Sequence, residues 1–573
     1  MKNILGKKQN LVLMIGLGIF SFLLAWYISG LKFDLNIPII YGEDGLFGGW
    51  YIKRLIDGAW YFSNDYTGFP FGSDFYDYPS ADFGNFFLLK LLGLITGNYA
   101  VTYNVYYLLG FPVTAIVSFW VLRQFQISTA FSLLGAVLFT FLPFHFLRIG
   151  HLFYTWYFVI PLFVYVGFKI FSDKPPFFDG RKSWLSKILL VFVLLIISSF
   201  GVYYAFFGVM IFMVSGFIAW RQQKSLKYIF SALIAIGIVG LGVGINVTPN
   251  LVYKFQHGAN KEIAQRWPPE SEHYGLKIIQ LLLPHSAHRS DFLAKANKKY
   301  AAQFPLVNEN ASASLGVLGS VGFLMLIYVF FMRRENKEED PHLYWLALMT
   351  IFLVLFATIG GFSAVFALLI TPMIRAWNRM SVVIGFMSIA ALMIVLDQYM
   401  KKKYALRWMI LLVIGLGLFG LWDQTPRSCE TCLKERQQVF MNDQQFVEEI
   451  EKTVPANTAI YQLPYMAFPE VPPIHELHDY GLFKGYLHSQ QLKWSYGGTK
   501  GREGDEFFKD LSTKPISAQV AIIKQLGFSG IYIDRRGYTD HAAAVEKELT
   551  QILGKPAAIV SADGNLSFFD IGR

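Results

Sequence analysis

Long apolar segments alternate with short polar segments from the N-terminus as far as residue 422. Because a helix needs about 20 apolar residues to cross a bilayer, this pattern predicts about eleven membrane-spanning helices. The predicted spans are residues 11–28, 99–122, 129–149, 152–171, 185–200, 202–220, 228–247, 313–332, 343–360, 380–398 and 405–422. Two further runs differ: residues 86–95, interrupted by Lys90, predict an interfacial or re-entrant helix, and residues 362–372 are too short to cross.

The pattern changes after Trp422, where proline and charged residues become more frequent and apolar runs shorten. Helical and strand periods alternate in this tail. They predict helices at 443–453, 516–526 and 542–553, strands at 459–463 and 530–533, and a hairpin of 557–560 with 566–569 around Asp563-Gly564. We therefore expect a membrane domain, residues 1–422, with outer loops at 32–84 and 248–312, followed by an exported α/β domain, residues 423–573.

Composition supports a multispanning membrane protein. Hydrophobic residues make up 54% of the chain and charged residues 16%, whereas soluble proteins average about 25% charged residues. A net charge of +10 could indicate a nucleic-acid partner. The positive residues lie beside the apolar segments, however, so we assign them to topology and expect the bilayer, not nucleic acid, as a partner.

Positive charges also predict the orientation. Lys2, Lys7 and Lys8 precede a first span that is longer than the apolar core of a signal peptide, so we expect an uncleaved helix with a cytoplasmic N-terminus. If each span crosses the membrane once, every connecting segment that falls on the cytoplasmic side is basic, as the positive-inside rule requires. Their basic residues are Arg123, Lys174, Arg181, Lys182, Arg221, Lys224, Lys227, Arg333, Arg334, Lys337, Lys401, Lys402 and Lys403. The stretch 32–84, the loop 248–312 and the tail are predicted to lie on the outer face.

The stretch 32–84 interleaves acidic and aromatic residues, a combination that suits a sugar or polyol better than an ion. Glu43 and Asp44, flanked by Gly42 and Gly45, could act as the general base for a hydroxyl acceptor. Asp34 is a competing candidate, and a solvated acidic loop is the alternative interpretation of the pair.

Residues 70–82 of the same stretch are rich in turn-forming residues, aromatics and aspartates. Asp74, Asp77 and Asp82 could bind hydroxyl groups there. An ordered structural loop explains the same pattern equally well.

Several cations fall on the predicted outer side, where topology does not require them. Guanidinium groups match the geometry of a phosphate, so we expect these residues to bind the phosphate of a lipid carrier. The candidates are His145, Arg148, His151, Arg266, Arg375, Asn378 and Arg379, with His288 and Arg289 as further outer-loop residues. Headgroup anchoring, or pairing with the acidic stretch, is the alternative.

Some motifs are missing from the sequence and others are incomplete. It contains no P-loop and no Gly-x-Ser-x-Gly elbow; an outer-face enzyme of this kind would need its activated donor on a lipid. Cys429 and Cys432 are too few for a structural zinc site, and an exported location favours a disulfide over free thiols. His475, His478 and His488 near Asp479 are better explained as surface or hydrogen-bonding residues than as metal ligands.

This arrangement resembles the GT-C superfamily, multispanning glycosyltransferases that use polyprenyl-phosphate sugars and carry an essential acid on the first outer loop. The chain also looks like a group of bacterial membrane proteins named sugar translocase or phosphoglycerol transferase. The shared strings are Pro70–Asp74 with Asp77–Pro79 and Ala81-Asp82, Leu142–Arg148 with Gly150-His151, Arg375–Arg379, Gly485–Ser489, Trp494–Gly497 and Gly530–Arg535. The Asp-Glu order of some GT-C members is reversed here, which leaves the choice between Glu43 and Asp44 open.

The resemblance implies an inverting glycosyltransferase of cell-envelope polysaccharide biosynthesis, in a bacterial cytoplasmic (inner) membrane. A polyprenyl-phosphate sugar would be the donor and a glycan or lipid the acceptor, with no certain cofactor, although a divalent metal could assist. Two alternatives stay open: a flippase for a lipid-linked saccharide, and a phosphoglycerol transferase.

Overall fold

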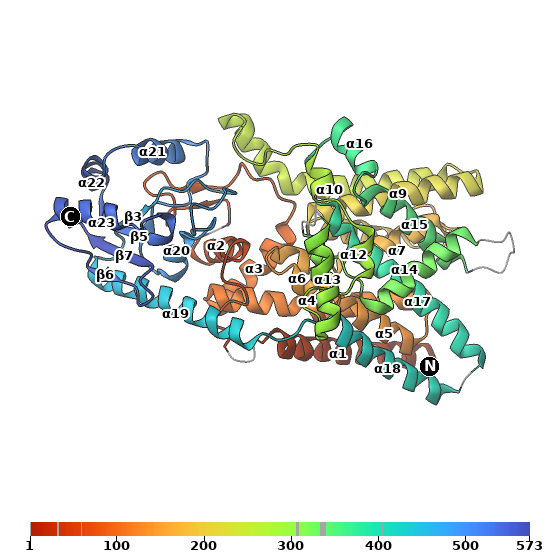
Figure 1. Cartoon of the computed structure of the whole chain (residues 1–573). Coiled ribbons are helices and arrows are strands. Elements are labelled where there is room, and N and C mark those ends of the chain that lie inside the picture. Colours follow the sequence, from red (N-terminus) through yellow and green to blue (C-terminus); the bar gives the residue numbers. More distant parts are fainter. Residues whose placement is uncertain are drawn as a thin grey trace.

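The structure is a computed structural model that describes residues 2–30, 34–58, 60–304, 309–332, 340–403 and 405–572. A long helical bundle carries a smaller sheet-containing region at one end (Figure 1). Some of the residues used to predict topology lie outside the described residues: Arg333, Arg334 and Lys337, and the side chains of Lys2, Lys7 and Lys403. The first two residues of the predicted outer loop 32–84 also lie outside them.

Every predicted span coincides with a helix. The helices are α1 (Lys2–Ser29), α4 (Tyr99–Gln124), α5 (Thr129–Thr140) with α6 (Pro143–Leu147), α7 (Val159–Phe171), α8 (Trp184–Ile197), α9 (Val202–Gln223), α10 (Lys227–His257), α14 (Gly316–Phe331), α15 (Pro341–Ala357), α17 (Ser381–Lys403) and α18 (Leu406–Gln424). Within the described residues, seven helices are long and apolar enough to cross a membrane. The predicted class, a polytopic helical membrane protein with a C-terminal α/β region, is confirmed.

The predicted number of spans is larger than this length criterion supports. Four predicted spans, α7, α8, α14 and α15, are apolar helices of only 13 to 17 residues. The predicted span 152–171 shows why one of these helices is short. Residues 152–158 are apolar but do not extend α7, because Leu152–Thr155 form a separate 3₁₀ turn. The runs expected to be too short to cross are α3 (Phe83–Thr96) and α16 (Phe362–Leu369).

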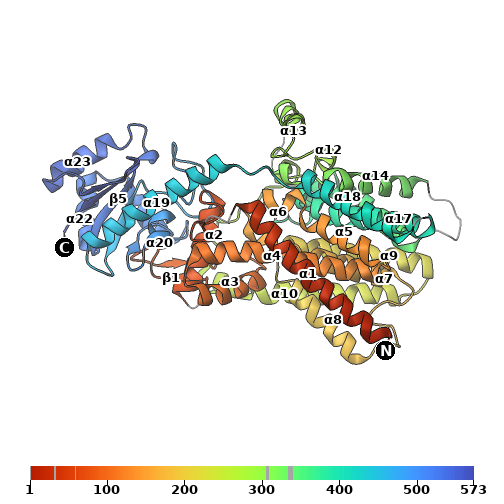
Figure 2. The ribbon, with the colours of Figure 1, turned by 90° about the horizontal axis from the view of Figure 1, so that it is seen from below.

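Helix α17 is the centre of the bundle. It is buried along most of its length and packs against α5, α7, α14 and α15. Its crossing with α14 is close, because a Cβ atom on Gly322 would lie 2.1 Å from the carbonyl oxygen of Ser388; small residues allow such contacts between membrane helices. By contrast, α1 and α18 run along the outside (Figure 2) and expose apolar side chains such as Leu23 and Leu418.

The C-terminal region is built on a five-stranded sheet of order β4-β3-β5-β7-β6. Strand β3 (Ala459–Leu463) pairs in parallel with β4 (Lys493–Trp494) and β5 (Phe528–Asp534), and β7 (Leu566–Asp570) pairs antiparallel with β5 and β6 (Ile559–Val560). The helices of this region are α19 (Glu430–Thr453), α20 (Phe483–His488), α21 (Glu503–Ser512), α22 (Ile516–Gln525) and α23 (Ala543–Leu553).

Most elements of the tail match their predictions. The strand at 459–463 and the hairpin around Gly564, whose φ is +74°, are confirmed. Helix α19 begins at Glu430, thirteen residues before the predicted start at residue 443. The added turns are mostly exposed and polar, so they lack the apolar period that marks a packed helix.

The first outer segment is folded against this C-terminal region. It contains helix α2 (Asp44–Asp57) and the short pair β1 (Ser63–Asn64) and β2 (Ser73–Asp74). Backbone hydrogen bonds join it to the far end of the chain: Trp494 N donates to Tyr66 O at 2.8 Å, and Phe69 N donates to Trp494 O at 3.0 Å. Many of its aromatic rings are therefore core residues, and Trp50, Tyr61 and Phe75 are at most 1% exposed. This corrects the expectation of a ring-lined sugar surface.

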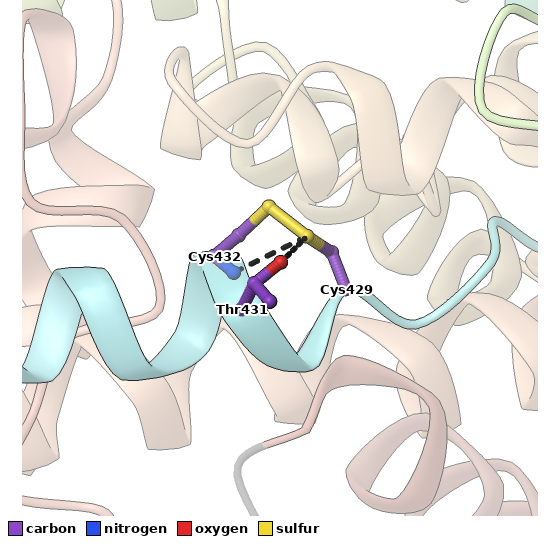
Figure 3. The surroundings of a disulfide bond; sticks show 3 residues. All are labelled: Cys429, Thr431 and Cys432. Carbon is purple, nitrogen blue, oxygen red and sulfur yellow. Dashed lines mark hydrogen bonds between the residues drawn. A yellow bond between two sulfur atoms is a disulfide. The ribbon is translucent and has the colours of Figure 1, made fainter.

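Cys429 and Cys432 form a disulfide at the start of α19 (Figure 3). Both residues are exposed, and the sulfur of Cys429 accepts a hydrogen bond from the backbone N–H of Cys432 at 3.2 Å. The disulfide predicted from an exported location is present.

The disulfide provides a test of orientation. We expect a membrane-impermeant maleimide to label these cysteines in intact cells only after an impermeant reductant is added, because the bonded sulfurs have no free thiol and the tail is predicted to face outward. A gel shift with maleimide-polyethylene glycol measures this, and the double variant Cys429→Ser/Cys432→Ser is the control. Labelling before reduction would contradict the disulfide, and labelling only after lysis would contradict the outward tail.

Candidate functional site

Asp44 is the first residue of α2, at the junction between the helical bundle and the C-terminal region (Figure 1). Glu43 is the N-cap residue and has a left-handed φ of 43°, and the backbone N–H of Gly45 donates to Gly42 O at 2.9 Å. The turn thus fixes where the helix begins. The Glu43 side chain is 72% exposed and that of Asp44 is 45% exposed.

The surroundings of Asp44 hold its pKa near neutrality. Partial burial raises the pKa of Asp44 to about 6, and the negative charges of Asp479, Glu309 and Glu43 add to the shift. A carboxylate with a pKa near the working pH is well suited to accept a proton from a hydroxyl group.

His151 connects Asp44 with a second carboxylate, Glu309. The Nδ1 atom of His151 lies 3.7 Å from Asp44 Oδ2, and its Nε2 atom lies 3.8 Å from Glu309 Oε1. Burial and the positive charges of Arg379 and Arg148 lower the pKa of His151 to about 3, so the ring is neutral at physiological pH.

Glu309 is bound to a buried arginine. Arg148, which is 4% exposed, donates from Nη1 to Glu309 Oε2 at 2.7 Å and from Nη2 to Asn378 Oδ1 at 2.9 Å. Burial alone would raise the pKa of Glu309, but the charges of Arg148 and Arg379 outweigh it and lower that pKa to about 2. Glu309 is therefore ionised at any physiological pH.

Arg379 is a second buried cation in the same place. It is 7% exposed, and its guanidinium carbon lies 4.1 Å from the ring centre of Tyr154 and 4.4 Å from that of Tyr203. Within the described part of the chain, its guanidinium makes no hydrogen bond or ion pair, and its Nε atom is buried without a partner. Of the two buried guanidiniums, only that of Arg148 is paired with Glu309, and Arg379 acts on this carboxylate through its charge.

A cavity of about 380 Å³ lies beside this group, between residues 262–266, Arg375 and the segment 470–500. Arg266 makes a bidentate pair with Glu470, with distances of 2.8 Å and 3.1 Å, and Arg375 pairs with Glu270. Tyr78 also donates to Glu470, at 2.9 Å. The walls of this cavity carry both charges, and the C-terminal region contributes Glu470, Asp479 and Lys500.

The structure brings together part of the predicted site. Asp44, Arg148, His151, Asn378 and Arg379 form one group, although their helices are separated in the sequence. Arg266 and Arg375 line the neighbouring cavity.

Other candidates are placed elsewhere. His145 is fully buried in the bundle, where its ring stacks on Phe111 at 3.6 Å and its Nδ1 atom lies 3.1 Å from Tyr157 Oη, so it is a core residue rather than a phosphate ligand. Asp34 lies with Arg436 in a separate groove at the start of α19. Arg289 donates to Thr425 Oγ1 at 2.9 Å, at the end of α18.

The three aspartates of residues 70–82 make contacts within the protein. Asp77 forms a bidentate pair with Arg502, with both distances 2.7 Å. Asp82 precedes α3 and accepts hydrogen bonds from Ser80 and Asn85. Asp74 belongs to β2 and its carbonyl oxygen accepts from Thr499. These contacts agree with the alternative of an ordered structural loop, although binding of hydroxyl groups by these residues stays a prediction.

Sequence reasoning missed the carboxylates that face the arginines. Glu309, Glu270, Glu470 and Asp479 come from three separate segments with no local motif. Arginines that are buried on the predicted outer face need anionic partners. The acidic residues of the loop 248–312 could therefore have indicated Glu309 and Glu270 as candidates. No comparable signal pointed to Asp479.

No group of three or more His, Cys, Asp or Glu side chains that could hold a metal ion is found within the described residues. Asp44, His151 and Glu309 are the nearest approach to one. The imidazole of His151 bridges the two carboxylates, since each of its nitrogens faces a different one. Ligands of a single metal ion would instead have to converge on one point.

No protein-family model and no curated protein matches the chain. Among solved structures, the chain is similar to an oligosaccharyltransferase of Archaeoglobus fulgidus in complex with zinc and sulfate, at 12% identity, covering 93% of this chain and 70% of that one, with a TM-score of 0.43. It is also similar to ArnT from Cupriavidus metallidurans bound to undecaprenyl phosphate, at 11% identity, covering 97% of both chains, with a TM-score of 0.41. These values are too low to assign a site or an activity to this chain.

The carboxylate of Glu309 gives a test of anion binding that needs no substrate. Removing one partner of a buried ion pair costs about 3–5 kcal/mol, so we expect Glu309→Ala to lower the thermal unfolding temperature in nanodiscs. Millimolar inorganic phosphate should restore much of that loss, because it can replace the missing negative charge beside Arg148 and Arg379.

The matched control is Glu546→Ala, which breaks the Arg535–Glu546 pair of the C-terminal region, 2.7 Å in the wild type. Phosphate should not rescue that variant. Equal rescue of both variants, or of neither, would contradict an anion site at the two arginines.

Proposed function

We propose that the protein is an inverting glycosyltransferase that uses a polyprenyl-phosphate-linked sugar on the outer face of a bacterial cytoplasmic membrane. The observation that carries this proposal is Arg379, a buried guanidinium with no hydrogen-bonding partner within the described residues, next to Arg148 and close to a titratable carboxylate. A desolvated cation of this kind favours a phosphate ligand, since guanidinium and phosphate form strong charge-assisted hydrogen bonds.

In the proposed reaction Asp44 accepts the proton of the acceptor hydroxyl as its oxygen bonds to the anomeric carbon of the donor. The bond between that carbon and the phosphate oxygen breaks, and both of its electrons leave with the phosphate. The carrier thereby changes from a singly charged diester to a doubly charged monoester, and Arg379 and Arg148 stabilise the charge that develops. Attack from the face opposite the leaving phosphate inverts the anomeric centre.

His151 and Glu309 support this arrangement. The neutral imidazole lies between Asp44 and Glu309 and separates two negative charges. Glu309 leaves the pair of arginines with one net positive charge, which favours an anionic donor over a neutral one. The cavity bounded by Arg266, Arg375 and the segment 470–500 is the proposed place of the acceptor.

The membrane orientation is part of the proposal. Lys174, Arg181 and Lys227, all predicted to face inward, line one cavity together. The carboxylates and arginines of the candidate site lie beside the C-terminal region, as expected if that region is outside.

A flippase is the second candidate, and the placement of charge favours the transferase. A lipid-linked saccharide in transit needs polar groups along the depth of the membrane. Residues 381–396 of α17, the helix at the centre of the bundle, contain no charged residue. Phosphoglycerol transfer is the third candidate and is separated by the label used below.

We expect Asp44→Asn to reduce transfer by at least about 100-fold, the scale of general-base catalysis, while expression and membrane insertion are unchanged. The assay uses purified protein in liposomes with a donor that is radiolabelled in the sugar. Label in an acceptor indicates glycosyl transfer, and redistribution across the bilayer without product indicates a flippase. A parallel assay with a donor radiolabelled in a glycerol phosphate group tests the third activity.

Asp65→Asn is the matched control, because it removes a carboxylate from the same outer segment at an exposed position. Glu43→Gln tests the neighbouring acid, whose exposed side chain predicts a much smaller effect. Full transfer by Asp44→Asn would remove Asp44 from the mechanism.

The rate should also depend on the ionisation of Asp44. Because the pKa of Asp44 is about 6, we expect kcat/KM to be constant above pH 7 and to fall about tenfold per pH unit below 6. The negative charge of Asp479 contributes to that raised pKa, so Asp479→Asn should move the acid limb to lower pH. Asp510→Asn, on the far part of the C-terminal region, should leave the limb in place, and an unmoved limb in Asp479→Asn would contradict the assignment.

A further inference from the structure

Four polar side chains, two buried and two half-buried, join the approach to Asp44 with the C-terminal region. Tyr41 donates its hydroxyl to Asp443 Oδ2 at 3.0 Å, and the same hydroxyl lies 2.8 Å from His488 Nε2. Lys484 Nζ lies 2.7 Å from Asp443 Oδ2 and 5.0 Å from the centre of the Tyr41 ring. We call these four residues, Tyr41, Asp443, Lys484 and His488, the tyrosine clamp.

In the clamp, the direction of the hydrogen bond between Tyr41 and Asp443 determines which proton His488 carries. A hydroxyl has one hydrogen, and Tyr41 gives it to the carboxylate, so His488 must donate from Nε2 to the Tyr41 oxygen. Burial lowers the pKa of His488 to about 4, and a neutral imidazole in that tautomer provides the single hydrogen required. Asp443 thus accepts a hydrogen bond from Tyr41 and forms an ion pair with Lys484.

The clamp is also desolvated. The side chains of Lys484 and Asp443 are only 7% and 3% exposed, and Phe440 packs edge-on against both Tyr41 and His488. A buried ion pair contributes little net stability, and its best-attested use is to fix one arrangement among several. The arrangement fixed here is that of the chain entering α2.

Tyr41 precedes Asp44 by three residues, and the chain between them has little freedom. Gly45 N bonds to Gly42 O and Leu46 N bonds to Glu43 O, both at 2.9 Å. The next turns of α2 also rest on the C-terminal region, since Trp50 stacks on Phe483 at 5.1 Å. A displacement of Tyr41 should therefore displace the Asp44 carboxylate by a similar distance.

We propose that the tyrosine clamp positions the Asp44 carboxylate, so that the C-terminal region is an integral part of the catalytic arrangement and not only an attached module. Tyr41, Asp443, Lys484 and His488 are positioning residues in this proposal and none of them touches substrate. The proposal rests on the proposed function for the role of Asp44, but not for the mechanical link itself.

Tyr41→Phe tests the link with the smallest change, because it removes one hydroxyl and keeps the ring packed against Phe440. We expect faster hydrogen–deuterium exchange at the backbone amides of residues 42–47, which local opening of the turn would expose. We also expect kcat to fall on the order of 10-fold, since a misplacement of about 1 Å can cost about 100-fold. The KM for the donor should stay unchanged, and the acid limb of the pH profile should move down as Asp44 leaves its neighbouring carboxylates.

Tyr465→Phe is the matched control. Its hydroxyl also donates to a buried aspartate of the C-terminal region, Asp505, at 2.7 Å, but the pair belongs to another part of that region. This variant should change neither the exchange of residues 42–47 nor the pH profile.

The two measurements separate the possible failures. Unchanged exchange at residues 42–47 in Tyr41→Phe overturns the proposal whether or not the protein transfers a sugar. Faster exchange with unaltered kcat and pH profile overturns the positioning role, provided that Asp44→Asn is inactive. If Asp44→Asn is fully active, the proposed role of Asp44 fails, while the exchange result still decides the mechanical link.

Discussion

Two guanidinium groups are buried at the edge of the helical bundle, and the carboxylate of Glu309 is paired with only one of them, that of Arg148. This imbalance of charge constrains the rest of the structure. Arg148 follows α6, Glu309 comes from the long outer loop and Asn378 precedes α17, so three distant segments must meet to satisfy one cation. The second cation, Arg379, is held mainly by two tyrosine rings. Cation–π contacts offset only part of the cost of desolvation, and this is the reason for proposing an anion as the ligand of Arg379.

Burial and neighbouring charges explain why the nearby acids behave differently. Glu309 is held ionised by the arginines, whereas partial burial and neighbouring carboxylates, Glu309 among them, raise the pKa of Asp44 to about 6. Two acids of similar chemistry thus have different roles because their surroundings differ. His151 lies between them, with one ring nitrogen 3.7 Å from Asp44 and the other 3.8 Å from Glu309.

Much of the fold could be predicted from the sequence, and the reasons are local. Apolar length determined the membrane helices, since no other short-range pattern produces runs such as residues 202–220. The Asp563-Gly564 turn determined the last hairpin, because glycine accepts the left-handed backbone found there. The helix that begins at Asp44 was not predicted, because it packs against α3 and α4 as well as α20 of the C-terminal region, and the local sequence pattern does not reveal these contacts.

The candidate site was predictable only in part, for the same reason. Arg148 and Arg379 were recognisable because a cation beside a membrane span is costly and is therefore expected to have a function. Their partner Glu309 was not, since an acid in a long outer loop looks like any solvated acid until the fold brings it to an arginine. The aromatic residues led to a wrong expectation. Trp50, Tyr61 and Phe75 are residue types found on sugar-binding surfaces, but here they are buried in the protein core.

The closure of the first outer segment against the far end of the chain has a consequence for biosynthesis. Tyr486 donates to Asp57 from a position 429 residues later in the sequence. At about 5–20 residues per second, the ribosome needs about 20–90 seconds to make the chain between them. During that interval the aromatic residues of the first segment are without part of the surface on which they pack, so this segment completes its fold only after the C-terminal region has been made.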